Sequence, residues 1–293
     1  MKRNTAAGAA VLNKKMDALK KAIEKKGALA VGFSGGVDSA LLAKVAYDAL
    51  GENALAVTID SELLPRSEFR AARELARLIG IRHSVVKSSP LSNKRFADNP
   101  KNRCYYCKKD DVSAIAAEAG RNGCFTAVRG AASPLLRRGI KCVAFGATAS
   151  DLSDYRPGIK ACDELGVWQP LLELGFTKDE VRAAAKLMRL PVWNKPAAAC
   201  LASRIACGEA ITKKKLAMIE RAEDFLHSLG FDLVRVRLHD DSARIEVAPD
   251  DIAKAAALAG KIAPALRALG YERIVLDMEG YTPGGANLQR KKK

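Results

Sequence analysis

The feature that most constrains the fold of this chain is a glycine-containing loop at the junction of a buried strand and a helix. The continuous apolar run 28–33 is typical of a buried parallel strand. It is followed by Ser34-Gly-Gly-Val-Asp-Ser39 and then by a helical pattern over 40–50. Glycines let backbone N–H groups close around an anion, and the helix N-terminus adds the positive end of its dipole. The sequence therefore predicts an α/β fold built around a phosphate-binding loop.

The same alternation of strand and helix continues beyond the loop. It predicts an open, doubly wound parallel sheet with its ligand crevice at the carboxyl ends of the strands. We expect further strands over 54–59, 83–87 and 142–145, and further helices over 11–25, 67–78 and 178–188.

Beyond residue 191 the alternation stops, and a smaller α+β domain is expected. A chain of 293 residues suits two unequal domains, which we place at 1–195 and 196–293. The second domain is expected to contain helices over 212–229 and 252–269, and strands over 233–238, 243–247 and 273–278. Between 121 and 140 periodicity is lost, which indicates a loop or insertion.

Composition narrows the class of protein. The hydrophobic fraction of 48% excludes a disordered chain, and 49 Lys and Arg against 33 Asp and Glu give a net charge of +16. That charge favours anionic partners such as nucleotides, phosphorylated metabolites or RNA. We find no apolar run of about 20 residues and no signal-peptide pattern, so a cytoplasmic location is expected.

The loop differs from a Walker P-loop because it contains no lysine and lacks the Gly-Lys-Ser/Thr ending. An alternative interpretation is a tight turn in which Asp38 and Ser39 merely start the helix.

Seven cysteines are too few for a disulfide scaffold and indicate thiol chemistry or metal ligation. Cys104 and Cys107 form a Cys-x-x-Cys pair that is redox-active, a zinc half-site or a coincidence. Joined by Cys200, the pair would offer three ligands to one metal centre and leave a coordination position open. Cys207 is able to replace one of these ligands. We expect the remaining cysteines to be structural: Cys124, Cys142 and Cys162.

The loop resembles that of the PP-loop ATP pyrophosphatases, and six further segments resemble the LarE family over nearly the whole chain. The most specific of them is Lys195-Pro-Ala-Ala-Ala-Cys-Leu-Ala-Ser-Arg204. The others are Ser61-Glu-Leu-Leu-Pro65, Asn102-Arg-Cys-Tyr-Tyr-Cys-Lys108, Ser150-Asp-Leu-Ser-Asp-Tyr-Arg-Pro-Gly158, Ala243-Arg-Ile-Glu-Val247 and Gly280-Tyr281.

This resemblance implies an ATP-dependent sulfur transferase that helps to build the nickel-pincer nucleotide cofactor. Such an enzyme adenylates a carboxylate of a pyridinium-dicarboxylate mononucleotide and converts it to a thiocarboxylate. A carboxylate oxygen is a poor leaving group, and transfer of AMP to it allows sulfur to attack. The resemblance also implies ATP and Mg²⁺ as cofactors and a homo-oligomeric assembly, with no membrane partner.

The resemblance assigns roles to individual residues of the first domain. The loop residues would hold the β and γ phosphates beside Mg²⁺: Ser34, Gly35, Gly36, Asp38 and Ser39. Asp60 and Ser61 would face the adenosine, although polar residues at strand ends are commonly turn formers. A third group would line the crevice around ATP: Gly146, Asp151, Asp154 and Arg156. Here the chain departs from the family, because Gly146-Ala147-Thr148 stands where Gly-Thr-Asn is expected.

The source of the sulfur is the main choice that the resemblance leaves open. Cys200 matches the family's catalytic cysteine, and Ser203 and Arg204 would supply a hydrogen-bond donor and a positive charge beside it. We favour a 4Fe-4S cluster on Cys104, Cys107 and Cys200 that carries an extra sulfide. The alternative is that Cys200 gives up its own sulfur and becomes dehydroalanine.

In the second domain the resemblance places phosphate and metal near Glu223, Arg235 and Glu246, of which the two glutamates would be metal ligands. Ordinary surface charge is the alternative interpretation. Arg235 and Arg237 alternate with apolar residues, so both are expected on one face of a strand. Trp193 would either pack or flank the substrate.

Three other functions compete with this hypothesis. A tRNA thiolase shares the loop and suits the charge, but we find no RNA-binding appendage with interleaved aromatics. An amide-forming synthetase would leave the three cysteines without a role. A nucleotide-binding sensor would bind ATP without releasing pyrophosphate.

Overall fold

The computed structural model describes residues 2–123, 143–153, 156–196 and 198–282, which form two compact units. The N-terminal unit comprises Met1–Ser61, Arg66–Ser88 and Cys104–Ala197. The C-terminal unit comprises Glu62–Pro65, Ser89–Arg103 and Ala198–Lys293. This division differs from the expected boundary after residue 195, because two short segments from the first part of the chain pack with the C-terminal unit.

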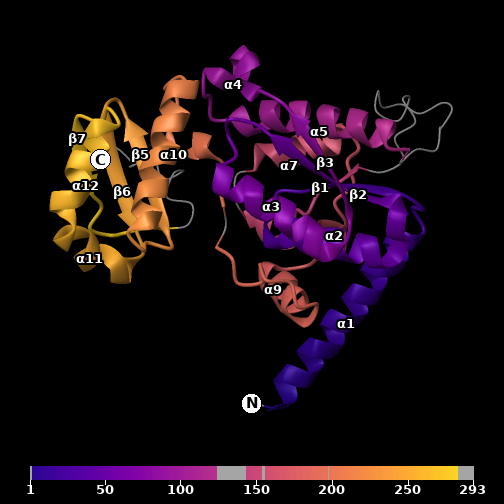
Figure 1. Ribbon diagram of the computed structural model, residues 1–293. Coiled ribbons are helices and arrows are strands. Elements are labelled where there is room, and N and C mark those ends of the chain that lie inside the picture. The colour runs from indigo at the N-terminus through magenta and orange to yellow at the C-terminus, as the bar shows by residue number, and fades with distance from the viewer. Residues whose placement is uncertain (1, 124–142, 154–155, 197, 283–293) are drawn as a thin grey trace. The chain divides into compact units, whose positions relative to one another are not determined.

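The N-terminal unit is built on a four-stranded parallel sheet in the order β3-β2-β1-β4. Figure 1 labels three of these strands, β1, β2 and β3. Its strands are β1 (Leu29–Gly32), β2 (Ala54–Asp60), β3 (Arg82–Lys87) and β4 (Val143–Ala144). Strand β1 pairs with β2 on one side and with β4 on the other. The chain moves outward from β1 through β2 to β3 and then crosses back to β4, so the direction of the strand order reverses beside β1. Ligands of open α/β sheets bind at this kind of switch point.

Helices cover both faces of this sheet, and neighbouring residues of β1 divide between two cores. Leu29 and Val31 pack in one core and Ala30 in the other. The first core is covered by α1 (Lys2–Glu24), α2 (Val37–Leu50), α3 (Arg66–Ile79) and α9 (Lys178–Leu187). The second is covered by α5 (Arg103–Arg121) and α7 (Pro157–Glu164). The doubly wound fold is confirmed.

Helix α5 was not predicted, although its sequence carries a signal for it. Val112, Ile115, Ala116 and Ala119 recur at helical spacing, and all four are buried. The loop expected over 121–140 falls largely on residues 124–142, outside the described part of the chain. Of the strand expected over 142–145, the structure describes residues 143–145, and two of these form β4.

The C-terminal unit contains a three-stranded sheet in the order β5-β6-β7, antiparallel between the first pair and parallel between the second. Its strands are β5 (Val234–His239), β6 (Ser242–Val247) and β7 (Arg273–Leu276). Its longer helices are α10 (Lys213–Ser228), α11 (Ile252–Ala257) and α12 (Ala259–Ala268). This confirms the expected α+β arrangement.

The single helix expected over 252–269 was wrong, because two helices meet at Leu258. Leu258 donates to the carbonyl of Lys254 and caps the next helix. Within α12, Gly260 has low helix propensity and Pro264 has no N–H to donate to the Gly260 carbonyl, so the second helix adds little support for continuing the first one through Leu258.

Short helical segments complete the structure: η1 (Gly51–Asn53), η2 (Pro90–Ser92), α4 (Lys94–Ala97), η3 (Ala149–Ser153), α8 (Pro170–Glu173), η4 (Leu201–Arg204) and η5 (Pro249–Asp251). Among the described helices, none combines the length and apolar character needed to cross a membrane.

Candidate active site

The glycine loop connects β1 to α2 and is braced by its own serines. The Ser39 hydroxyl donates to the carbonyl of Gly36 at 3.0 Å and lies 3.2 Å from the hydroxyl of Ser34. Gly35 has a φ of +73°. A Cβ on Gly35 would lie 2.9 Å from the Cβ of Ala72 in α3, so a side chain has no room there. The loop therefore opens on the N-terminus of α2, where backbone N–H groups attract an anion.

Lys178 supplies the positive charge that the loop itself lacks. Its ammonium forms an ion pair with Asp38 Oδ2 from a position 140 residues further along the chain. Lys178 is held at the start of α9, where Thr177 and Glu180 form a capping box and the Lys178 N–H donates to Ser150 Oγ at 3.0 Å. Sequence spacing gave no sign of this contact, because only the packing of α9 beside α2 brings the two residues together.

Asp38 has a second carboxylate oxygen that faces a different environment. Within the described residues, Oδ1 is buried and has no hydrogen-bond partner. A buried carboxylate oxygen without a donor is costly unless a cation or water satisfies it. Mg²⁺ favours carboxylate oxygens beside phosphates, so this atom fits the metal that ATP would bring.

The end of β4 packs tightly against the loop. A Cβ on Gly146 would lie 2.9 Å from the carbonyl carbon of Asp38, and one on Gly32 would lie 2.4 Å from the ring of Phe145. Gly146 therefore allows the close approach of two backbones. The segment after β4 therefore lies directly against the start of α2.

The segment after Gly146 is stabilised by its own polar groups. The N–H and hydroxyl of Thr148 donate to Asp151 Oδ2 at 2.8 and 3.0 Å. Arg156 approaches Asp151 Oδ1 at 3.1 Å. Thr148 thus holds Asp151 in place where the family pattern has an asparagine. Asp154 lies outside the described residues.

Asp60 and Ser61 lie at the end of β2 and are both engaged by Arg66. The guanidinium donates to Asp60 Oδ1 at 2.6 Å and to the carbonyl of Ser61 at 2.8 Å. The two residues therefore form a fixed turn, and any contact of theirs with adenosine stays a prediction.

A half-buried histidine supports the strand that leads into the loop. Thr58 donates to the carbonyl of Phe33 at 2.7 Å, so its oxygen accepts from His83 Nε2 at 2.9 Å. Burial lowers the pKa of His83, and the charge of Arg73 lowers it further. A neutral His83 therefore helps to fix the backbone immediately before Ser34.

Cys104 and Cys107 occupy the first turns of α5. Their spacing of three places both on one side of the helix. Cys104 is exposed, whereas Cys107 is half-buried with its Sγ 3.9 Å from Asp111 Oδ2. Next to Cys107, the ammonium of Lys108 lies 4.2 Å from the ring centroid of Phe145. The cysteine-bearing turn therefore lies beside the end of β4.

Cys200 lies in the C-terminal unit as the exposed residue that precedes η4. Arg204 is only 3% exposed and donates to the carbonyls of Ala199 and Cys200 at 2.6 and 3.1 Å, and to Ser203 Oγ at 3.0 Å. Its other nitrogens donate to both oxygens of Glu223 at 2.9 and 3.0 Å. Arg204 therefore fixes the backbone around Cys200.

Glu223 and Glu246 are buried, which excludes ordinary surface charge as their explanation. Glu223 also accepts from the N–H of Val236 at 2.9 Å. Glu246 accepts from Arg237 at 2.9 Å through one oxygen and from Arg244 at 2.9 Å through the other. Arginines thus already neutralise both carboxylates, and metal ligation by them stays a prediction.

Arg235 and Arg237 lie two residues apart in β5, opposite Glu246 and Arg244 of β6. Arg235 is buried, and this burial, reinforced by the charge of Arg204, lowers its pKa. Arg237 donates to the carbonyl of Ser203 at 3.0 Å. This face of the sheet therefore combines arginines with the segment that carries Cys200.

The remaining candidates have separate surroundings. Trp193 is half-buried beneath Lys186, whose ammonium lies 4.5 Å from its ring centroid. Cys207 is exposed with its Sγ 3.5 Å from the carbonyl of Asn99. Cys162 is buried, and burial raises its pKa to about 11, as suits a structural thiol. Cys124 and Cys142 lie outside the described residues.

Comparison with known proteins covers nearly the whole chain. The chain is 39% identical over 279 residues to an uncharacterized protein of Synechocystis sp.. This match covers 94% of this chain and 98% of the relative. The chain is 36% identical over 258 residues to the pyridinium-3,5-bisthiocarboxylic acid mononucleotide synthase of Lactiplantibacillus plantarum. This match covers 88% of each chain. An uncharacterized protein of Methanocaldococcus jannaschii is 24% identical over 251 residues.

A family model described as NAD synthase matches residues 11–109, which include the glycine loop and the strands β1 to β3. This match covers three of the four strands of the parallel sheet, whereas the relatives extend through the C-terminal unit. The chain therefore belongs to the LarE-like PP-loop ATP pyrophosphatases and is an enzyme of that family.

Proposed function

We propose that the enzyme adenylates a carboxylate of a pyridinium-dicarboxylate mononucleotide and converts it to a thiocarboxylate for nickel-pincer cofactor synthesis. The observation that carries this proposal is the 36% identity to a pyridinium-3,5-bisthiocarboxylic acid mononucleotide synthase over 88% of both chains. The loop, Lys178 and the Cys200 segment supply the groups that the two steps need.

In the first step the loop would bind the pyrophosphate that leaves. Backbone N–H groups at the start of α2 stabilise the charge that develops on it, and Lys178 lies at the same loop to add a positive charge. Asp38 would keep Oδ1 for Mg²⁺ while Oδ2 holds Lys178. Proper placement of these charges is what makes AMP transfer fast.

In the second step sulfur would displace AMP from the activated carboxylate. Cys104, Cys107 and Cys200 would hold a 4Fe-4S cluster, which would supply a sulfide for this attack. Two observations support this proposal: Cys104 and Cys107 share one side of α5, and Cys200 is exposed on a segment that Arg204 holds. If no cluster forms, the exposed Cys200 thiol would be the sulfur donor itself.

Arg235 and Arg237 are suited to bind the phosphate of the mononucleotide. Arginine presents a planar fork of donors that matches phosphate oxygens. Both arginines lie on the β5 face that contacts the Cys200 segment through Ser203. This would place the substrate's phosphate on the C-terminal unit.

The reaction is tested by incubating the enzyme with ATP, Mg²⁺, sulfide and the pyridinium-dicarboxylate mononucleotide. We expect pyrophosphate release that depends on the mononucleotide, and a thiocarboxylate product by mass spectrometry. Release stimulated by bulk tRNA instead would favour the thiolase, and release coupled to ammonia would favour an amide synthetase.

Variants separate the two steps. Lys178→Gln should lower the rate of pyrophosphate release by roughly 10²-fold or more, as the loss of one charge-stabilising donor does in other enzymes. Lys186→Gln, in the same helix but beside Trp193, should leave that rate unchanged. Cys200→Ala should retain pyrophosphate release and lose the thiocarboxylate.

The sulfur source is tested by iron and acid-labile sulfide in protein purified without oxygen. About four irons per chain, lost in the Cys104→Ala, Cys107→Ala and Cys200→Ala variants, is the expected result. Absence of iron after reconstitution would leave Cys200 as a donor that acts once, and the intact mass of each reacted chain should then be lower by a single H₂S.

A further inference from the structure

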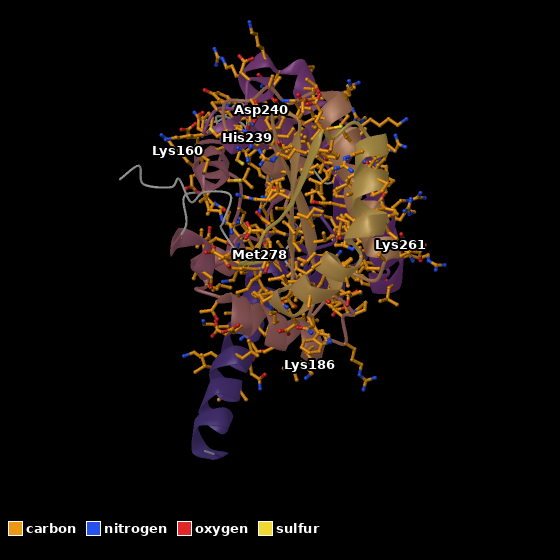
Figure 2. The ribbon with its side chains drawn as sticks, turned by 90° about the vertical axis from the view of Figure 1, so that its left-hand side faces the viewer. Lys160, Lys186, His239, Asp240, Lys261 and Met278 are labelled. Atoms are coloured by element: carbon orange, nitrogen blue, oxygen red, sulfur yellow. The ribbon has the colours of Figure 1, made fainter. Side chains whose placement is uncertain are left out.

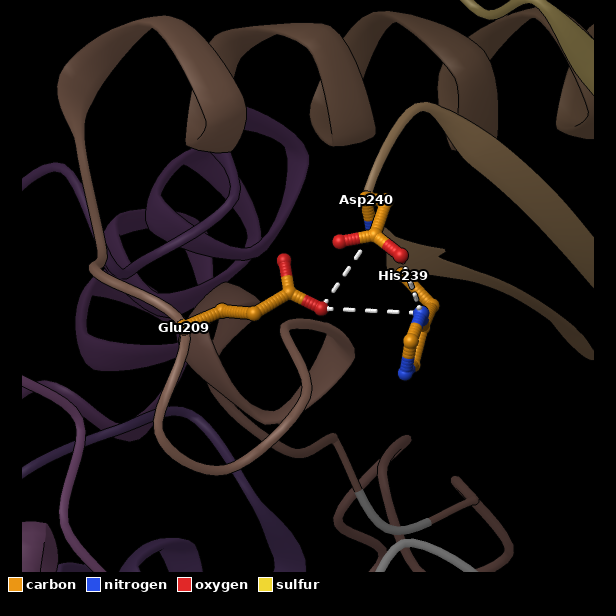
Figure 3. Close-up of side chains that lie close together, drawn as sticks. All are labelled: Glu209, His239 and Asp240. Carbon is orange, nitrogen blue, oxygen red and sulfur yellow. Dashed lines mark hydrogen bonds and ion pairs between the residues drawn. The ribbon is translucent and has the colours of Figure 1, made fainter.

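Three metal-ligating side chains converge at the surface of the C-terminal unit: Glu209, His239 and Asp240. His239 ends β5 and Asp240 begins the turn into β6, whereas Glu209 comes from the loop that precedes α10. Figure 2 shows His239 and Asp240 side by side at the surface, and Figure 3 shows all three side chains pointing toward one another. One ligand atom from each lies within 4.8 Å of the others.

We propose that these three residues bind a Zn²⁺ ion. The proposal does not depend on the sulfur-transfer function, and no step of that function uses these residues. One imidazole nitrogen with two carboxylate oxygens is a donor set that suits zinc, since Mg²⁺ and Ca²⁺ favour oxygen ligands alone.

The distances between the donor atoms fit a tetrahedral ion. Zinc bonds to nitrogen and oxygen of about 2.1 Å place two tetrahedral ligand atoms about 3.4 Å apart. His239 Nδ1 lies 3.1 Å from Asp240 Oδ2 and 3.9 Å from Glu209 Oε1. These separations bracket the ideal value, so small side-chain rotations would suffice to bind the ion.

Glu209 is held in place by groups outside the three ligands. Its Oε2 accepts from Lys215 at 3.0 Å, and its backbone carbonyl accepts from Asn99 Nδ2 at 3.0 Å. Oε1 accepts from the N–H of Asp240 at 3.2 Å and faces His239. A ligand that is positioned beforehand loses less conformational entropy when the ion binds.

The site would join two segments that are distant in sequence. The loop carrying Glu209 continues directly from Arg204 and Ile205, and Ile205 already forms a parallel bridge with Leu238 of β5. The exposed side chains of His239 and Asp240 leave room for water at a fourth coordination position. A bound Zn²⁺ would therefore fasten the segment that follows Cys200 to the β5–β6 turn.

The test is a calorimetric titration of the full chain with ZnCl₂ after its thiols are blocked as methyl disulfides, so that cysteines do not compete. We expect one equivalent of Zn²⁺ to bind. His239→Gln and Glu209→Gln should each weaken binding by at least about tenfold, because even outer-shell partners of a metal contribute that much. His227→Gln, a histidine of α10 outside the site, should bind as the unaltered chain does.

Lys215→Gln gives a result in the opposite direction. This change removes a positive charge that repels a cation beside Glu209, while the bonds from Asn99 and from the N–H of Asp240 still hold Glu209, so Zn²⁺ affinity should rise severalfold. A general loss of structure would lower the affinity instead. No zinc binding, equal affinity in the His239→Gln and unaltered chains, or tighter binding of MgCl₂ than of ZnCl₂ would each overturn the proposal.

Discussion

Gly35 and Gly36 have different reasons to be glycine, although they are adjacent in the loop. Gly35 has a φ of +73° and no space for a side chain, whereas Gly36 has an ordinary φ of −78°. A Cβ on Gly36 would meet only Ser34 Oγ at 3.4 Å. The shape of the loop therefore depends on Gly35.

Gly35→Ala should lower the free energy of unfolding by about 1–3 kcal/mol, because a non-glycine residue is strained at positive φ and its Cβ would press on Ala72. Gly36→Ala should change it by less than about 1 kcal/mol. Urea denaturation of the two variants measures the difference. Equal effects would show that the conformation of Gly35 does not limit stability.

His83 gives the N-terminal unit a dependence on pH. Its pKa is lowered from the ordinary value of 6.5, chiefly by burial, so the unfolded chain binds a proton more readily than the folded one. The contribution of His83 to the free energy of unfolding is therefore fully present above pH 6.5 and is lost as the pH falls below this value. His83→Gln should flatten the unfolding free energy across this range, as urea denaturation at a series of pH values would reveal. An unchanged profile would assign the effect to other groups.

At the scale of elements, a buried ion pair joins the short helix η4 to α10. Arg204 joins the carbonyls around Cys200 to Glu223 of α10, and Glu223 in turn accepts from β5. An exposed thiol is thus placed on a rigid support, which favours a fixed position for the sulfur.

Arg204→Met and Glu223→Leu should each destabilise the C-terminal unit by about 3–5 kcal/mol, because each leaves an uncompensated buried charge. The double variant should lose less than the sum, since it removes both charges together. Native-state hydrogen exchange of α10 amides measures these losses. Arg221→Gln, exposed on the same helix, serves as the control and should change stability by less than about 0.5 kcal/mol.

At the scale of the whole molecule, the C-terminal unit is discontinuous in sequence. Its main part starts at Ala198, but Ser89–Arg103 packs with it and brings Asn99. Asn99 is fully buried, has a φ of +53° and donates to the carbonyls of Ala206 and Glu209 at 2.7 and 3.0 Å. A segment from the first part of the chain thus supports the loop beyond η4.

Asn99→Gly should cost about 2–3 kcal/mol, because two partly buried carbonyls lose their donor. Asn99→Ala should cost about 1–2 kcal/mol more, because alanine is strained in the left-handed region and glycine is not. Hydrogen exchange at residues 205–211 measures both. If the two variants behave alike, the backbone conformation at this position carries no cost.

The alternation of apolar strands and helices, the glycine loop and the family motifs were all readable from the sequence, because each depends on residues near one another along the chain. Even there, α5 escaped prediction and the helix over 252–269 was broken at Leu258. The family assignment and the doubly wound sheet followed from these local patterns.

Only the tertiary structure decided which distant residues meet. It paired Lys178 with Asp38 across 140 residues, buried Arg204 against Glu223 and gathered Glu209 with His239 and Asp240. It also assigned Ser89–Arg103 to the C-terminal unit. Local periodicity determines which face of an element is apolar, but the partner of a charged side chain depends on how the elements pack together, and that is a property of the whole fold.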